Sequence, residues 1–235
     1  MLIGTDFDKI ETNIFGYKFL EINALYGDTL ILIVALILAY NVSKLAEKEA
    51  FFNNWKWFFI VFGIGFFAGG LGHFVFHYWG LPGKYASWYL GIVAVYFVER
   101  AVISIYPNEK WRGRFNSFFK IKLMLALLGA TWVFVFIDIS QDPQKGLLVP
   151  TINSIIGLGL IVGFMGYYYQ KTIAPSFKYL WISALVLIPS AIFQSKKINI
   201  HQWFDRNDAS HILLIISLFL YYKAIKGYSE KLKEN

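Results

Sequence analysis

Seven apolar runs, each long enough to cross a lipid bilayer, constrain the fold of this chain more than any other feature. A membrane-spanning helix needs about 20 mostly apolar residues, and backbone inside hydrocarbon must satisfy its own hydrogen bonds. The sequence therefore predicts an all-α integral membrane protein, a seven-transmembrane helix bundle that forms one domain over residues 1–235. The predicted spans are about 27–45, 55–79, 85–106, 119–138, 148–169, 177–194 and 208–225.

The basic residues lie mostly between these runs and predict an orientation. Of the 22 Lys and Arg residues, 15 fall on the side that holds the first, third and fifth loops and the C-terminal tail. Because basic loops stay in the cytoplasm, we expect the N-terminus outside and the C-terminus in the cytoplasm. The net charge of +7 then belongs to these loops, and we expect no nucleic-acid partner.

Two histidines stand one helical turn apart inside the second apolar run. The stretch reads Gly70-Leu71-Gly72-His73-Phe74-Val75-Phe76-His77. An i, i+4 spacing places both rings on one face of a helix. Since ionisable groups inside a bilayer are costly, we expect this pair to face the bundle interior and to have a buried partner.

The predicted orientation brings most polar residues of the spans to one depth, near the extracytoplasmic face, which favours one shared site. Glu99 is the exception, because it falls at the inner end of the third span, where Arg100 or a loop cation could neutralise it. The residues expected at the shared depth are Asp28, His73, His77, Asp138, Asn207, Asp208 and His211.

This set of side chains is typical of a metal site, and zinc is the expected ion. Neutral imidazole is a good zinc ligand, and catalytic zinc usually keeps three protein ligands and a water. The chain has no cysteine, which excludes thiolate ligands, so the expected ligands are His73, His77 and His211. Asp208 could be a fourth ligand or could orient an imidazole. The other expected supporting groups are Asn207, on nearly the same helical face as His211, and Asp28 and Asp138, either of which could orient a ligand or act as a general base.

The same histidine stretch resembles the Gly-x-Gly-Ser-x-x-Phe-His motif on the second helix of alkaline ceramidases. These enzymes belong, with the progestin and adiponectin receptors, to a superfamily of seven-helix zinc-dependent amide hydrolases. That family carries His-x-x-x-His on its seventh helix, and the matching place here reads Asn207-Asp208-Ala209-Ser210-His211. By this resemblance His77 and His211 match zinc-binding histidines, whereas Asn207 replaces a histidine and His73 replaces the serine. The family's aspartate after the second-helix motif has no counterpart, because residues 78–98 contain no acid.

The resemblance implies a zinc-dependent intramembrane hydrolase of a lipid amide, such as a ceramide-like or N-acyl lipid. Zinc-bound hydroxide would attack the carbonyl, and the catalytic carboxylates Asp138 or Asp208 would carry the proton. One alternative is a non-catalytic lipid-binding or receptor-like protein on the same scaffold, which the missing serine and histidine favour. Others are a b-type haem protein, with His73 or His77 and His211 as axial ligands, and a transporter.

Overall fold

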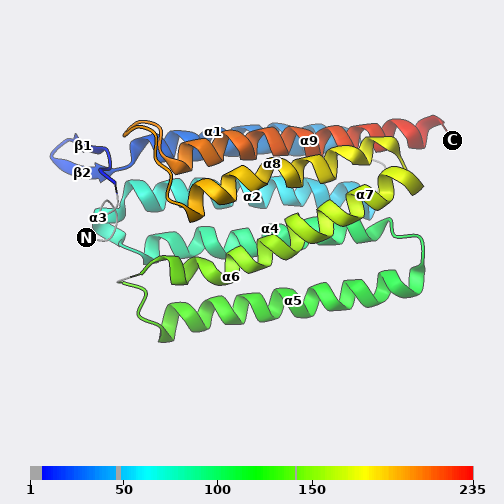
Figure 1. Ribbon diagram of the computed structural model, residues 1–235, viewed down its shortest axis with the longest axis horizontal. Helices are drawn as coiled ribbons and strands as arrows, with labels where there is room; N and C mark the ends of the chain where they lie inside the picture. The colour runs from blue at the N-terminus through cyan, green and yellow to red at the C-terminus, as the bar shows by residue number, and fades with distance from the viewer. Residues whose placement is uncertain (1–6, 46–48, 141, 235) are drawn as a thin grey trace.

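Among the residues that the structure describes, seven helices that are long and apolar enough to cross a membrane lie along the long axis of the molecule (Figure 1). The computed structural model describes residues 7–45, 49–140 and 142–234, so Lys48, one of the basic loop residues counted above, lies outside the described residues. The predicted seven-helix architecture is confirmed by the length and composition of these helices. The spanning elements are α1 (Ile22–Lys44), α2 (Ala50–Phe74), α4 (Pro82–Ser104), α5 (Glu109–Phe136), α6 (Gln144–Ser154) continued by η1 (Ile155–Val162) and α7 (Gly163–Thr172), η2 (Pro175–Phe177) leading into α8 (Lys178–Ser195), and α9 (Arg206–Glu234).

A β-hairpin and a short helix mark one end of the bundle, here called the hairpin end (Figure 1). Strands β1 (Glu11–Ile14) and β2 (Tyr17–Leu20) pair antiparallel, with Glu11 opposite Leu20. Phe15 and Gly16 form the turn with positive φ angles, as two-residue hairpin turns require. Helix α3 (Phe76–Trp79) packs beside β2. The all-α prediction missed this hairpin, because four-residue strands carry too little alternation to recognise.

Close packing of α2 against its neighbours organises the bundle. Helix α2 lies between α1 and α4, and α9 packs against α1 and α8. Glycines of α2 allow the approach to α4, since a Cβ added at Gly69 would lie 2.9 Å from the Ser87 hydroxyl oxygen and one at Gly65 would lie 3.1 Å from Leu90 Cβ. Small residues serve the same purpose at many membrane helix interfaces.

The large aromatic core and most of the buried charged groups occupy different ends of the bundle, and Glu99 is the exception. Large aromatic side chains from α2, η2 and α9 form the fully buried centre of the core near the end opposite the hairpin, among them Phe51, Trp55, Phe58, Phe177 and Tyr221. Aromatic rings of this group meet edge to face, as Phe51 and Phe177 do at 5.9 Å. The hairpin end instead buries charged groups, and it therefore contains the candidate site.

Two of the predicted spans differ in detail from the structure. Helix α2 stops at Phe74 rather than continuing to residue 79, because the chain turns at Val75 before α3 begins. The fifth span is not one regular α-helix, because the π-helical segment η1 separates α6 from α7. Neither change can be recognised from the spacing of apolar residues in the sequence. A one-residue break and a short π-helical segment barely alter that spacing.

A buried ion pair links α5 to the rest of the bundle. Helix α5 buries few apolar residues, namely Phe119, Ala126 and Ala130. Its Lys122 ammonium lies 2.6 Å from Glu99 Oε1 on α4 and donates to Asn153 Oδ1 on α6 at 2.6 Å. Glu99 is fully buried, so Lys122 supplies the loop cation that the sequence led us to expect for it.

Replacing Lys122 by Met should leave the Glu99 charge buried without its partner. Removing one member of a buried pair costs about 3–5 kcal/mol, so we expect Lys122→Met to lower the melting temperature in detergent, measured by circular dichroism. The exposed Lys120→Met is the matched control and should change little. The double variant Glu99→Gln/Lys122→Met should recover most of the loss, and a double variant as unstable as Lys122→Met would contradict this account.

Candidate functional site

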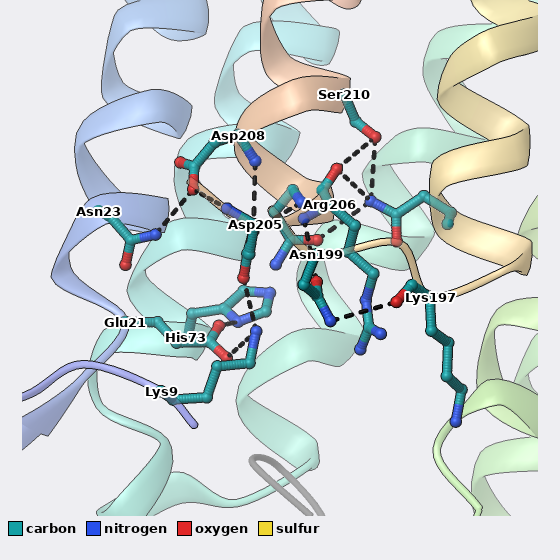
Figure 2. A network of polar contacts seen from close by, with 12 residues as sticks. Lys9, Glu21, Asn23, His73, Lys197, Asn199, Asp205, Arg206, Asp208 and Ser210 are labelled. Atoms are coloured by element: carbon teal, nitrogen blue, oxygen red, sulfur yellow. Dashed lines mark hydrogen bonds and ion pairs between the residues drawn. The ribbon is translucent and has the colours of Figure 1, made fainter. Parts of the chain in front are cut away.

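Lys9 joins three distant parts of the chain at the hairpin end (Figure 2). Its ammonium lies 3.1 Å from Glu21 Oε1, just before α1, and 2.6 Å from Asp205 Oδ2, just before α9. All three side chains are almost fully buried, with 7% or less of each exposed. Because buried charges are stable only when paired, this contact fixes the N-terminal segment and the α8–α9 loop to the bundle.

The electrostatics of this contact favour the charged forms of both partners. Burial acts to raise the pKa of Glu21, but the nearby His73 and Lys9 outweigh it and lower that pKa below its ordinary value. Burial likewise acts to lower the pKa of Lys9, but the carboxylates of Glu21 and Asp205 raise it above its ordinary value. The pair is therefore a fixed ionic element rather than a source of exchangeable protons.

His73 extends this contact from α1 to α2 and α4. Its Nδ1 atom pairs with Glu21 Oε2. The Lys84 ammonium lies 3.2 Å from Nδ1 and 3.1 Å from Nε2 of the same ring. Lys84 is the third residue of α4, so a cation from one helix and a carboxylate from another meet at one imidazole.

His77 does not share a helical face with His73, which corrects the prediction from their spacing. The turn at Val75 places His73 at the end of α2 and His77 in α3. The His77 Nε2 atom is buried and has no hydrogen-bond partner. His77 instead lies near enough to Glu11 of the hairpin to affect that carboxylate electrostatically.

Asp28 and His211 form a second pair deeper in the bundle. Asp28 follows Glu21 by seven residues, which places it about 10 Å further along α1. Its Oδ1 atom lies 3.0 Å from His211 Nε2 on α9, close enough for an ion pair although the geometry is not that of a hydrogen bond. Both residues are nearly inaccessible to solvent, with 4% of Asp28 and 8% of His211 exposed. A carboxylate and an imidazole thus face each other away from bulk solvent.

The start of α9 is held by a reciprocal cap. Asp205 Oδ1 accepts hydrogen bonds from the backbone N–H groups of Asn207 and Asp208, while Asp208 Oδ2 accepts from the backbone N–H of Asp205. This is the arrangement of a capping box. Asp208 also accepts from Asn23 of α1 at 2.9 Å, whereas Asn207 accepts from Gln194 of α8. Asn207 therefore faces α8, and Asp208 ties α9 to α1.

The charges of the buried network nearly cancel. The hairpin-end network comprises Lys9, Glu21, Asn23, Asp28, His73, Lys84, Asp205, Arg206, Asp208 and His211. Within it, as far as the structure describes this end, four carboxylates face two lysines and one arginine. The negative side chains are thus largely matched by positive ones, as buried charges require.

The remaining predicted site residue, Asp138, lies outside the network. It follows the end of α5, is exposed, and accepts a hydrogen bond from the backbone N–H of Ser140 at 2.9 Å. Hydrogen bonds from Ser140 lower the pKa of Asp138 below its ordinary value. The structure thus brings Asp28, His73, Asp208 and His211 into one network, whereas Asp138 lies at the same end of the bundle but outside that network.

The three histidines expected to hold zinc do not face one another. His73 is engaged by Glu21 and Lys84, and His211 directs Nε2 toward Asp28. The described residues contain no group of three or more His, Cys, Asp or Glu side chains arranged to hold a metal ion. As placed, these side chains do not fit one shared ion, and the zinc site stays a prediction.

Sequence reasoning missed six members of the network, namely Lys9, Glu21, Asn23, Lys84, Asp205 and Arg206. All six lie outside the predicted spans, and the three cations among them were counted only as loop charges. One signal was available, because Asp205-Arg206-Asn207-Asp208 before an apolar run is a capping pattern.

These features define a seven-helix, multi-pass type of membrane protein with a buried charge network at one end of the bundle. The chain belongs to the DUF6962 family, a family of unknown function, whose model matches residues 24–230. That match spans all seven helices and includes the Asp28–His211 pair, while Lys9 and Glu21 precede it. No curated protein and no solved structure matches the chain.

The position of Asp28 depends on Gly70 of α2. A Cβ added at Gly70 would lie 2.9 Å from Asp28 Cβ and 3.1 Å from the backbone Cα of Leu25. We therefore expect Gly70→Ala to push α2 away from α1 and to lower the melting temperature. Gly91→Ala on α4 is the matched control, because its Cβ meets nothing within 4 Å and alanine is the better helix former. Equal stability of the two variants, measured by thermal unfolding, would contradict the close contact.

Proposed function

We propose that the chain is an integral-membrane hydrolase that cleaves an amide bond of a membrane lipid. The observation that carries this proposal is the Asp28–His211 pair, a carboxylate and an imidazole 3.0 Å apart and screened from solvent. A buried acid–base pair inside a bundle is a functional-site hypothesis by default, because such groups are costly to place there. A substrate that reaches it must enter from the membrane or through the network, which suits a lipid with a polar linkage.

The residues of the network have complementary roles in this chemistry. The Asp28–His211 pair accepts a proton from water as the water oxygen bonds to the amide carbon, and returns it to the nitrogen as the carbon–nitrogen bond breaks. The products are a carboxylic acid and an amine, so atoms and protons balance. Lys84, held beside His73 and within electrostatic range of Asp28, would stabilise the negative charge that develops on the carbonyl oxygen.

The resemblance to the ceramidase superfamily supplies the amide class and the expectation of zinc. His211 occupies the matching position on the seventh helix and lies in the network, which supports a role for that helix. Zinc would add a Lewis acid and a hydroxide source. The mechanism above needs only side chains of this chain, so zinc binding is a separate proposal.

A non-catalytic lipid-binding or receptor-like protein is the second candidate. The closed state of the network favours it, since Asp28 and His211 are nearly inaccessible and Glu21 and His73 already have partners. In that case a ligand would bind and rearrange the ion pairs without being cleaved. Lipid binding without release of fatty acid distinguishes this candidate from the hydrolase.

We also propose that the hairpin end lies outside the cell and the C-terminus in the cytoplasm. The excess of Lys and Arg in the loops at the opposite end supports this orientation. It places the network near the extracytoplasmic face of the membrane.

Lipid amide hydrolysis tests the main proposal. Purified chain in mixed micelles should release fatty acid from an N-acyl sphingoid base or an N-acylethanolamine. Asp28→Asn should lower the rate by about 100-fold or more, the range that general acid–base groups contribute. Glu11→Gln, which changes a half-exposed carboxylate of the hairpin, is the matched control and should retain the rate.

Elemental analysis of the same preparation distinguishes a zinc-dependent hydrolase from one that uses the acid–base pair alone. Stoichiometric zinc that is lost in His77→Ala would support the zinc-dependent version. Hydrolysis by metal-free protein would support the acid–base pair alone. No release of fatty acid from either substrate class by folded protein would contradict both versions and leave the binding protein.

The absence of native cysteine makes the orientation testable by single substitutions. Phe15→Cys at the hairpin turn, where the side chain is 97% exposed, should react with a membrane-impermeant maleimide on intact cells. Lys233→Cys near the C-terminus should react only after lysis. The reverse pattern would overturn the proposed orientation.

A further inference from the structure

A cavity lies at the hairpin end between α4, α3 and the segment that follows α5. Its volume is about 470 Å³, within the range of ligand pockets. No residue of the Asp28–His211 pair lines it, and Phe76 separates it from the network, with the Lys84 ammonium 5.6 Å from the centre of the Phe76 ring. The cavity is therefore a neighbour of the candidate site rather than part of it.

The walls of the cavity are apolar and held in place by ring contacts. The apolar lining consists of Phe76, Leu81, Pro82, Tyr85, Phe134, Ile137 and Ile139. Tyr85 stacks on Phe134 with ring centres 4.2 Å apart and planes within 6°, so the α4–α5 wall is preformed. The cavity is open on one side, and its mostly apolar lining suits a hydrocarbon chain.

The lipid beside α5 can supply such a hydrocarbon chain. Helix α5 is only lightly buried along its apolar window and exposes Leu125, Leu128, Trp132 and Phe136. In a membrane this face meets lipid tails, and Phe136 leads directly to the cavity-lining Ile137. A tail in contact with α5 can therefore turn into the cavity without crossing a polar surface.

The polar residues at the rim of the cavity determine which lipid headgroup the site favours. Asp138 and Ser140 are the polar residues among those that line it. Asp138 is exposed and its hydrogen bonds from Ser140 favour the charged form, so the rim carries a negative charge. Such a rim attracts an ammonium group and repels an anionic headgroup.

We infer that this cavity binds one hydrocarbon chain of a bilayer lipid with a zwitterionic headgroup, whose ammonium group lies near Asp138. The site is distinct from the acid–base pair, and the inference holds whether or not the chain is a hydrolase. The bound lipid fills the space between α4 and the end of α5, where protein atoms leave a gap in the packing.

Photolabelling tests the inference with the full chain in phosphatidylcholine vesicles. A phosphatidylcholine with a diazirine in the part of one acyl chain close to the headgroup is irradiated, and labelled residues are mapped by mass spectrometry. We expect labelling around Phe134 and Ile137 to exceed labelling of Leu125 and Leu128 on the exposed face of α5. Labelling that is uniform over these positions would overturn the inference.

Two filling variants and a control make the result specific. Leu81→Trp and Ile137→Trp each occupy the cavity and should abolish the excess labelling of Phe134, whereas Leu125→Trp on the exposed face should not. Unchanged excess in both filled variants would overturn the inference. Efficient disulfide dimers of Ile137→Cys would also overturn it, by assigning the cavity to a second copy of the chain.

The headgroup is tested in the same way. The phosphatidylglycerol analogue should label the cavity less than the phosphatidylcholine analogue, and Asp138→Asn should remove that difference. Asp142→Asn, a nearby carboxylate that does not line the cavity, is the matched control. Equal labelling by both lipids in the unmodified chain would overturn the headgroup assignment.

Discussion

The cost of burying charge among membrane-spanning helices is the constraint on which the hairpin end depends. Glu21, Asp28 and Asp205 are each at most 4% exposed, and each is stable there because a cation or an imidazole lies beside it. These pairings draw together the N-terminal segment, α1, α2, α4 and the start of α9. The same ions help to position the α8–α9 loop and the β-hairpin, which also stacks Phe19 on Phe74 of α2.

The division of the bundle into an aromatic end and a charged end gives the network its setting. The aromatic core around Trp55 and Tyr221 fixes one end of the helices by close packing, which holds α1, α2 and α9 in register. At the other end these helices present Asp28, His73 and His211. Rigid support behind a polar group is what acid–base chemistry requires, because the partners must stay within reach of one another. The cavity proposed to bind lipid lies beside this division, where α4 and the end of α5 meet through the Tyr85–Phe134 stack.

The sequence was informative about helices and less so about contacts. Seven apolar runs predicted the spans, and the topology correctly gathered Asp28, His73 and His211 at one end. The His73–His77 spacing misled, because the helix breaks at Val75 between the two residues, and a break of one residue leaves the apolar pattern unchanged. Lys9 and Glu21 could not be placed from the sequence, since the contact of Lys9 with Asp205 spans 196 residues and forms only in the folded bundle. Asp138 lies outside the network because α5 ends two residues earlier and the side chain is exposed.

The central claim is that Asp28 and His211 act as one acid–base unit, and a double-mutant cycle on amide hydrolysis tests it most directly. Residues that act as a unit are strongly non-additive. The account predicts that Asp28→Asn, His211→Gln and the double variant all fall to the same residual rate of fatty acid release. Losses that multiply in the double variant, or single variants that keep the rate of the unmodified chain, would contradict it.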